Sequence, residues 1–147
     1  MVDSTNFILT QCVKAQLARL AFLKEYQGWV QDAYVKSALA FAIEDTQEAI
    51  ARVSSRLRQL DDPIADQAPD EAGEKLVRQA RTRRSTEDKI KFVWQGLKHQ
   101  LEWYSARIKE MKEDPDSQAI FVALAEQTRV RLERWETMMK ELKVPFD

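Results

Sequence analysis

Apolar residues recur at alternating steps of four and three along four long stretches of this sequence. The clearest repeat lies within residues 86–113 and consists of Ile90, Trp94, Leu97, Leu101, Tyr104, Ile108 and Met111. Such spacing places one apolar stripe along one face of an α-helix and favours left-handed packing between helices at shallow angles. The four prolines all lie outside the repeats, at Pro63, Pro69, Pro115 and Pro145. Proline therefore interrupts none of the four expected helices.

The repeats predict an all-α fold with helices over about 4–32, 34–60, 86–113 and 117–142. A length of 147 residues fits a single domain that covers residues 1–147. One uninterrupted helix through residue 60 would be about 85 Å long, so we expect a tight turn after the first helix. Residues 61–85 form a connection long enough to cross the length of a bundle, with a short helix near 74–84.

The charge balance and the apolar runs exclude several classes of partner. Lysine and arginine number 23 against 24 acidic residues, which leaves no overall field to attract nucleic acid or an anionic membrane. No stretch reaches the roughly 18 apolar residues of a membrane span, and the N-terminus lacks a secretory signal. The single cysteine, Cys12, fits a small buried side chain. We therefore expect a cytoplasmic protein without a nucleic-acid or membrane partner.

A basic run stands out within the 61–85 connection. It consists of Arg78, Arg81, Arg83 and Arg84, which could hold phosphate or nucleic acid. The same connection contains the acidic residues Asp61, Asp62, Asp66, Asp70, Glu71 and Glu74. We therefore expect the arginines to pair with carboxylates, either inside the chain or in a neighbouring molecule.

The order of two helices, a long crossover and two more helices resembles the ferritin-like superfamily, its rubrerythrin-like branch in particular. The apolar run 34–41 leads into Glu44 and Glu48, and Leu124-Ala125 leads into Glu126, much as the family's apolar runs lead into Glu-x-x-His motifs. The resemblance implies a left-handed four-helix bundle with its long crossover between the second and third helices. It also implies a di-iron centre in the bundle core.

The ligand positions of that centre are changed in this chain. The residues three positions after Glu44 and Glu126 are Gln47 and Arg129, and the single histidine, His99, cannot complete two motifs. No Ser-His-Asp grouping or glycine-rich phosphate loop is present either. We therefore expect no catalytic residue, no metal and no cofactor. An atypical metal site, if one formed, would use Glu44, Glu48, His99, Glu102 and Glu126.

Polar residues occupy the middle of the apolar stripes. They are Gln16, Thr46, Thr128 and Arg131, and we expect them to form a relic polar layer in which they hydrogen-bond to one another. A buried guanidinium needs a carboxylate or must extend to the rim. Glu44, Glu48 and Glu102 are the expected partners of Arg131, and the alternative is a place at the edge of the stripe.

The predicted function is a non-catalytic structural or interaction module. Trp29 and Trp103 lie beside their stripes and are candidate interface residues, for a homodimer or for an unidentified protein partner. The alternative is that both pack beneath the crossover. Two other functions stay open: metal or oxygen handling by an atypical carboxylate site, and binding of a small apolar ligand in a core pocket near Leu97 and Thr46.

Overall fold

The computed structural model describes residues 2–147, with side chains from Ser4 onward. Its helices are α1 (Val2–Trp29), α2 (Ala33–Gln59), α3 (Glu71–Arg81), α4 (Thr86–Glu110) and α5 (Pro115–Glu141). The described residues contain no strand, so the predicted all-α class is confirmed.

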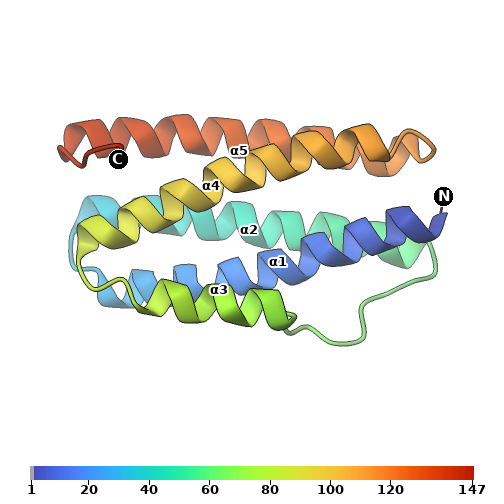
Figure 1. Ribbon diagram of the computed structural model, residues 1–147, viewed down its shortest axis with the longest axis horizontal. Coiled ribbons are helices and arrows are strands. Elements are labelled where there is room, and N and C mark those ends of the chain that lie inside the picture. Colours follow the sequence, from blue (N-terminus) through green and yellow to red (C-terminus); the bar gives the residue numbers. More distant parts are fainter. Residues whose placement is uncertain (1) are drawn as a thin grey trace.

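The long helices form two antiparallel hairpins that lie against each other (Figure 1). The first hairpin consists of α1 and α2 and the second of α4 and α5, with α2 and α5 also in contact. Figure 1 shows that the chain after α2 returns along the length of the molecule, through residues 60–70 and then α3. Helix α3 packs on α1, outside the two hairpins. This return path makes α2 and α4 run in the same direction.

Side-chain caps decide where the helices begin. Asp32, Asp70 and Ser85 each accept a hydrogen bond from the backbone N–H three residues later, which satisfies one free donor of the first helical turn. The Asp32 cap starts α2 directly after a short turn, so α1 ends at Trp29 and not near residue 32 as predicted. The Asp70 cap likewise starts α3 at residue 71, earlier than predicted.

The apolar core consists of two clusters at opposite ends of the molecule. One cluster surrounds Phe22 and Trp135, and the other surrounds Tyr104 and Phe121. Between them, the stripes carry polar side chains. The core is therefore interrupted near its middle, at the level of Arg19 on α1.

Close packing fixes α3 against α1. Tyr26 Oη donates to the Ala80 carbonyl over 2.6 Å. A Cβ atom on Gly73 would lie 3.0 Å from the Cβ of Ala18 and 2.9 Å from that of Pro69. Glycine at position 73 therefore allows the two helix backbones to approach closely, and α3 becomes one wall of a groove.

Candidate functional site

The four residues of the predicted polar layer hydrogen-bond to other residues and not to one another. Gln16 Nε2 donates to Tyr104 Oη over 3.2 Å. The Thr46 and Thr128 hydroxyls each donate to the carbonyl four residues earlier in their own helix. All three are buried, but the expected mutual network is not formed within residues 4–147.

Arg131 pairs with a carboxylate that the sequence analysis did not name. Its Nε donates to Asp45 Oδ2 over 2.7 Å, and its guanidinium lies 5.4 Å from the centre of the Phe41 ring. Glu44 and Glu48, two of the expected partners, are exposed on the same helix. The partner of Arg131 is a carboxylate, as predicted, but it is Asp45 and none of the three glutamates named from sequence.

The residues of the hypothetical metal site do not converge. The side chains of Glu44, Glu48, His99, Glu102 and Glu126 are all exposed. Glu126 pairs with Arg129, and Glu48 accepts a hydrogen bond from Gln127 over 2.7 Å. In the part of the chain that the structure describes, no three His, Cys, Asp or Glu side chains are placed to hold a metal ion. The atypical carboxylate site therefore has no geometric support.

The core pocket expected near Leu97 and Thr46 is very small. A cavity at this position has a volume of about 20 Å³, and its walls include Arg19, Gln100 and Arg131. This volume is close to that of one water molecule, and the walls are too polar for an apolar guest. A ligand cannot occupy the core at this point without moving the helices.

A larger groove opens on the other side of Arg19, between α1, α3 and α4. Its volume is about 620 Å³, which lies within the range of small-molecule binding sites. Its lining is more apolar than polar, and it consists of Gln11, Cys12, Ala15, Gln16, Arg19, Asp70, Ala72, Gly73, Lys75, Leu76, Gln79, His99, Gln100 and Trp103. Of the candidate site residues predicted from sequence, Gln16, His99 and Trp103 line this groove.

Arg19 lies at the inner end of this groove without an ionic partner. Its Nε is buried and has no hydrogen-bond partner, and Nη2 donates weakly to the Gly96 carbonyl at 3.4 Å. Burial lowers the pKa of the guanidinium to about 10, and neighbouring Tyr104 and Cys12 offset only part of that shift. No carboxylate among the described residues balances this charge.

Glycine and two amides shape the space around the guanidinium. A Cβ atom on Gly96 would lie 2.8 Å from Arg19 Nη1, so glycine at this position leaves room for the cation. The Oε1 atoms of Gln16 and Gln100 are buried and have no hydrogen-bond partner. The inner end of the groove therefore combines one unpaired cation with polar atoms that a ligand or water can satisfy.

The aromatic side chain of Trp103 forms one wall of the groove. Trp103 packs against Tyr104 and Phe121, with ring centres 5.7 and 5.6 Å away. It is half-buried, and its role as an interface residue stays a prediction. Lys75 and His99 also line this groove, both are exposed, and each can donate a hydrogen bond.

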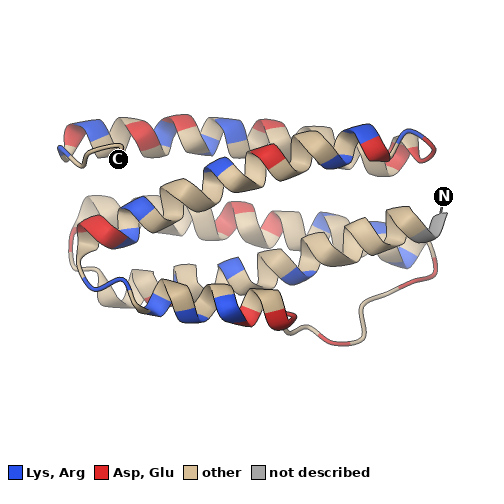
Figure 2. Ribbon diagram, viewed as in Figure 1, with Lys and Arg blue, Asp and Glu red and all other residues tan. Residues whose placement is uncertain are grey.

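The second candidate interface residue, Trp29, has charged surroundings. It is 52% exposed at the end of α1 and shares a pocket with the basic run of residues 81–84. Figure 2 places that run at the α3–α4 connection, whereas the acidic residues of 61–74 lie toward the opposite end of α3. Arg81 pairs with Glu25 on α1. The expected pairing inside the chain is therefore formed at Arg81, with an acid from outside the 61–74 segment.

Sequence reasoning missed Arg19, although two signals pointed to it. Arg19 lies three residues after Gln16 and therefore shares its helix face, which borders the apolar stripe. Gly96 interrupts a helix of otherwise larger residues. What linked these positions was the packing of α1 on α4, which the repeat of either helix alone does not specify.

Comparisons of the chain with protein-family models, with curated proteins and with solved structures found no match. Among residues 2–147, no helix is both long enough and apolar enough to span a membrane. The groove and the side chains that line it are therefore the features of the chain that point to a function.

Proposed function

We propose that this protein is a non-catalytic binding protein for a small organic anion with an apolar body, held in the groove between α1, α3 and α4. The observation that carries the proposal is Arg19, a largely buried cation without a carboxylate partner at the inner end of a groove of about 620 Å³. This hypothesis modifies the small-ligand alternative from sequence, because the ligand is charged at one end and sits in the groove.

The energetics favour an external anion. A buried charge without a partner destabilises the folded state by several kcal/mol relative to a paired one. A carboxylate accepts two hydrogen bonds from a guanidinium and supplies the missing charge. Gln16, Gln100 and Cys12, which line the groove together with Arg19, are neutral, so a singly charged head group fits better than a doubly charged one.

The walls of the groove specify the rest of the ligand. Trp103, Leu76 and Ala15 offer apolar surface in the same groove as the guanidinium. An aliphatic chain or a single aromatic ring would bury its surface there, with a gain of about 25 cal/mol per Å². A medium-chain fatty acid or an aryl carboxylic acid has both features.

We also infer that the fold is a ferritin-like bundle that no longer holds a di-metal centre. The parallel direction of α2 and α4 and the long return path between them support this inference. The Arg19 cation, at the level where the apolar core is interrupted, would oppose a divalent metal. Homodimerisation and a role as an interaction module stay predictions, which analytical ultracentrifugation would test.

Calorimetric titration with octanoate tests the binding proposal, with 1-octanol as the uncharged control. We expect octanoate to bind at least about tenfold more tightly than octanol, which corresponds to roughly 1.4 kcal/mol. Arg19→Gln should remove that preference. Arg52→Gln, at an exposed position on α2, should leave it unchanged.

A second variant distinguishes a loss of binding from a folding defect in Arg19→Gln. Gly96→Ala should displace the guanidinium without removing its charge, and should weaken octanoate binding while helicity by circular dichroism stays the same. Equal affinity for octanoate and octanol would contradict the proposal. So would a lack of binding by both octanoate and benzoate at millimolar concentration.

A further inference from the structure

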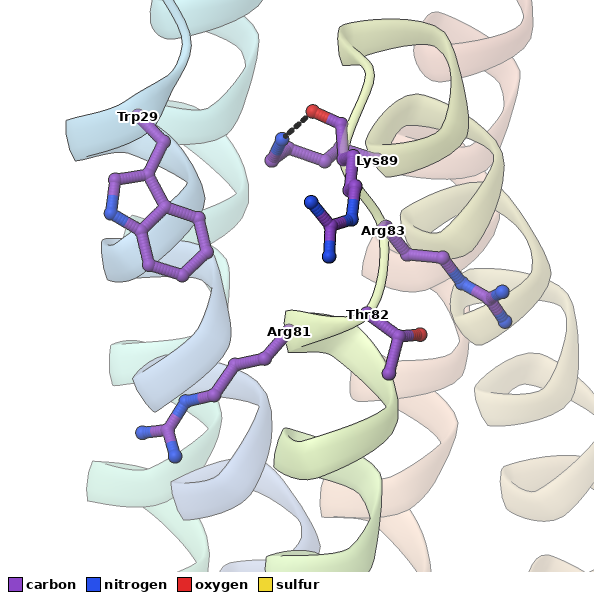
Figure 3. A pocket seen from close by; sticks show the side chains of 6 residues that line it. Trp29, Arg81, Thr82, Arg83 and Lys89 are labelled. Atoms are coloured by element: carbon purple, nitrogen blue, oxygen red, sulfur yellow. Dashed lines mark hydrogen bonds between the residues drawn. The ribbon is translucent and has the colours of Figure 1, made fainter.

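A second pocket lies at the corner where α1 ends and α4 begins. It is an open pocket of about 650 Å³, lined by Trp29, Arg81, Thr82, Arg83, Arg84 and Lys89. Figure 3 shows Trp29 on one side and Lys89 on the other, beside the α3–α4 connection. Four of the lining residues are cationic and none is acidic.

Two of these cations interact with residues that do not line the pocket. Arg81 forms an ion pair with Glu25 at 2.8 Å, and the Arg83 guanidinium lies 5.1 Å from the centre of the Phe92 ring. In Figure 3 the Arg83 side chain extends away from Trp29. Arg84, in contrast, is exposed and forms no ion pair within the described chain. The charges available in the pocket are therefore those of Arg84 and Lys89.

Lys89 is the unusual member of the pair. The residue is 8% exposed, and its Nζ donates to the Arg84 carbonyl over 2.6 Å. That bond uses one of the three hydrogens of the ammonium group. No carboxylate lies within ion-pair distance of Nζ in the described part of the chain, and the nearest rings are Tyr26 and Trp29, 5.8 and 5.9 Å away. A buried ammonium group without a counter-ion lowers the stability of the folded state, and a bound anion would offset this loss.

The backbone adds a further donor set at the same place. Ser85 caps α4 by accepting from the Asp88 N–H, so the start of this 25-residue helix faces the same connection. The first turn of a helix favours anions through its free N–H groups and its dipole. Two carboxylates also occupy that turn, but Glu87 is directed to Lys91 at 3.5 Å and Asp88 is exposed outside the pocket lining.

We propose that this corner binds a phosphate monoester carried on a planar ring system, such as a mononucleotide. Arg84 and Lys89 hold the phosphate, and the exposed face of Trp29 stacks on the ring. Two available cations beside a helix start match a doubly charged phosphate better than a carboxylate. The planar ring of the ligand would cover the exposed face of Trp29, whose side chain is 52% exposed without it.

This site is separate from the groove at Arg19. Trp29 follows Arg19 by ten positions on α1, which is about 15 Å along the helix axis. No residue lines both pockets. The proposal therefore does not depend on the proposed function, and each can fail without the other.

A small ligand fits the corner better than a nucleic acid polymer does. The chain has a net charge of −1, and Figure 2 shows acidic and basic residues interleaved along α4 and α5. A polymer would meet those carboxylates on either side of the corner, with repulsion that a single phosphate avoids.

The test is a calorimetric titration of the full chain with adenosine monophosphate, inorganic phosphate and adenosine. We expect the monophosphate to bind most tightly, phosphate more weakly, and adenosine at least about tenfold more weakly than the monophosphate. Arg84→Gln and Lys89→Met should each reduce monophosphate affinity about tenfold, whereas Arg52→Gln should not change it. Quenching of tryptophan fluorescence by the monophosphate should disappear in Trp29→Phe.

Several outcomes would overturn the proposal. One is equal affinity for adenosine and adenosine monophosphate. Another is wild-type affinity for the monophosphate in both Arg84→Gln and Lys89→Met. A third is no binding of the monophosphate at millimolar concentration. A ten-nucleotide single strand that binds far more tightly than the monophosphate would overturn it too, in favour of nucleic acid. Arg19→Gln should retain monophosphate binding, which separates failure here from failure at the groove.

Discussion

Arg131 on α5 and Asp45 on α2 form an ion pair, with Nε and Oδ2 2.7 Å apart, that joins the two helical hairpins. The two side chains are 14% and 24% exposed, so water screens the pair only in part. The pair lies beside the small cavity at the middle of the core.

Removal of this pair should destabilise the fold measurably. We expect Asp45→Ala to lower the free energy of unfolding by about 1–3 kcal/mol, because it leaves a mostly buried guanidinium without a counter-ion. Glu44→Ala removes an exposed carboxylate from the neighbouring position and should change stability by less than about 0.5 kcal/mol. Urea denaturation followed by circular dichroism measures both. Equal values for the two variants would contradict the role assigned to the pair.

Replacement of Arg19 by methionine should stabilise the ligand-free protein. The substitution removes a largely buried unpaired cation and fills the same space with an apolar side chain, for which a gain of about 1–2 kcal/mol is expected. Differential scanning calorimetry should show a higher Tm than that of wild type. Arg52→Met serves as the control at an exposed position, and a lower Tm for Arg19→Met would indicate that the guanidinium has an internal partner.

Asp114 should contribute to the loss of stability in acid. Burial would raise the pKa of Asp114, but hydrogen bonds from Ser117 and Arg56 outweigh burial and hold it below its ordinary value. A carboxylate with a lowered pKa in the folded state stabilises the fold above its ordinary pKa, and this contribution disappears as the pH falls through the folded value.

The corresponding variant is Asp114→Asn, which keeps a side-chain cap for α5 and removes the charge. We expect it to lose about 1–2 kcal/mol at pH 7 relative to wild type, and the difference should shrink toward zero as the pH falls from about 4 to 2. Denaturation curves over this pH range measure the effect. Asp116→Asn is the matched exposed control, and a difference independent of pH would show that the charge of Asp114 is not the cause.

Cys12 should resist thiol reagents while the protein is folded. The residue is 2% exposed, and burial raises the pKa of its thiol to about 12, with Tyr104 and Arg19 lowering it only in part. Because the thiolate is the reactive form, labelling by a disulfide reagent at pH 8 should be negligible in the native protein and complete in urea. Rapid labelling without denaturant would show that α1 opens locally at this position.

The sequence by itself determined the helices, since the information for them is local. The four-three repeat, the absence of proline within it and capping residues such as Asp32 and Ser85 act over one or two turns, and the observed helices follow them. The changed ligand positions likewise argued against a di-iron centre without any knowledge of the packing.

Tertiary structure decided which polar side chains meet. Successive residues on a helix point about 100° apart, so the choice of Asp45 over Glu44 or Glu48 as the partner of Arg131 depends on the rotation of α2 against α5. In the same way, the packing of α1 on α4 places Arg19 over Gly96, and the return path of the chain brings Arg84 beside Trp29. These contacts join residues more than 50 positions apart, and a repeat within one helix carries no information about them.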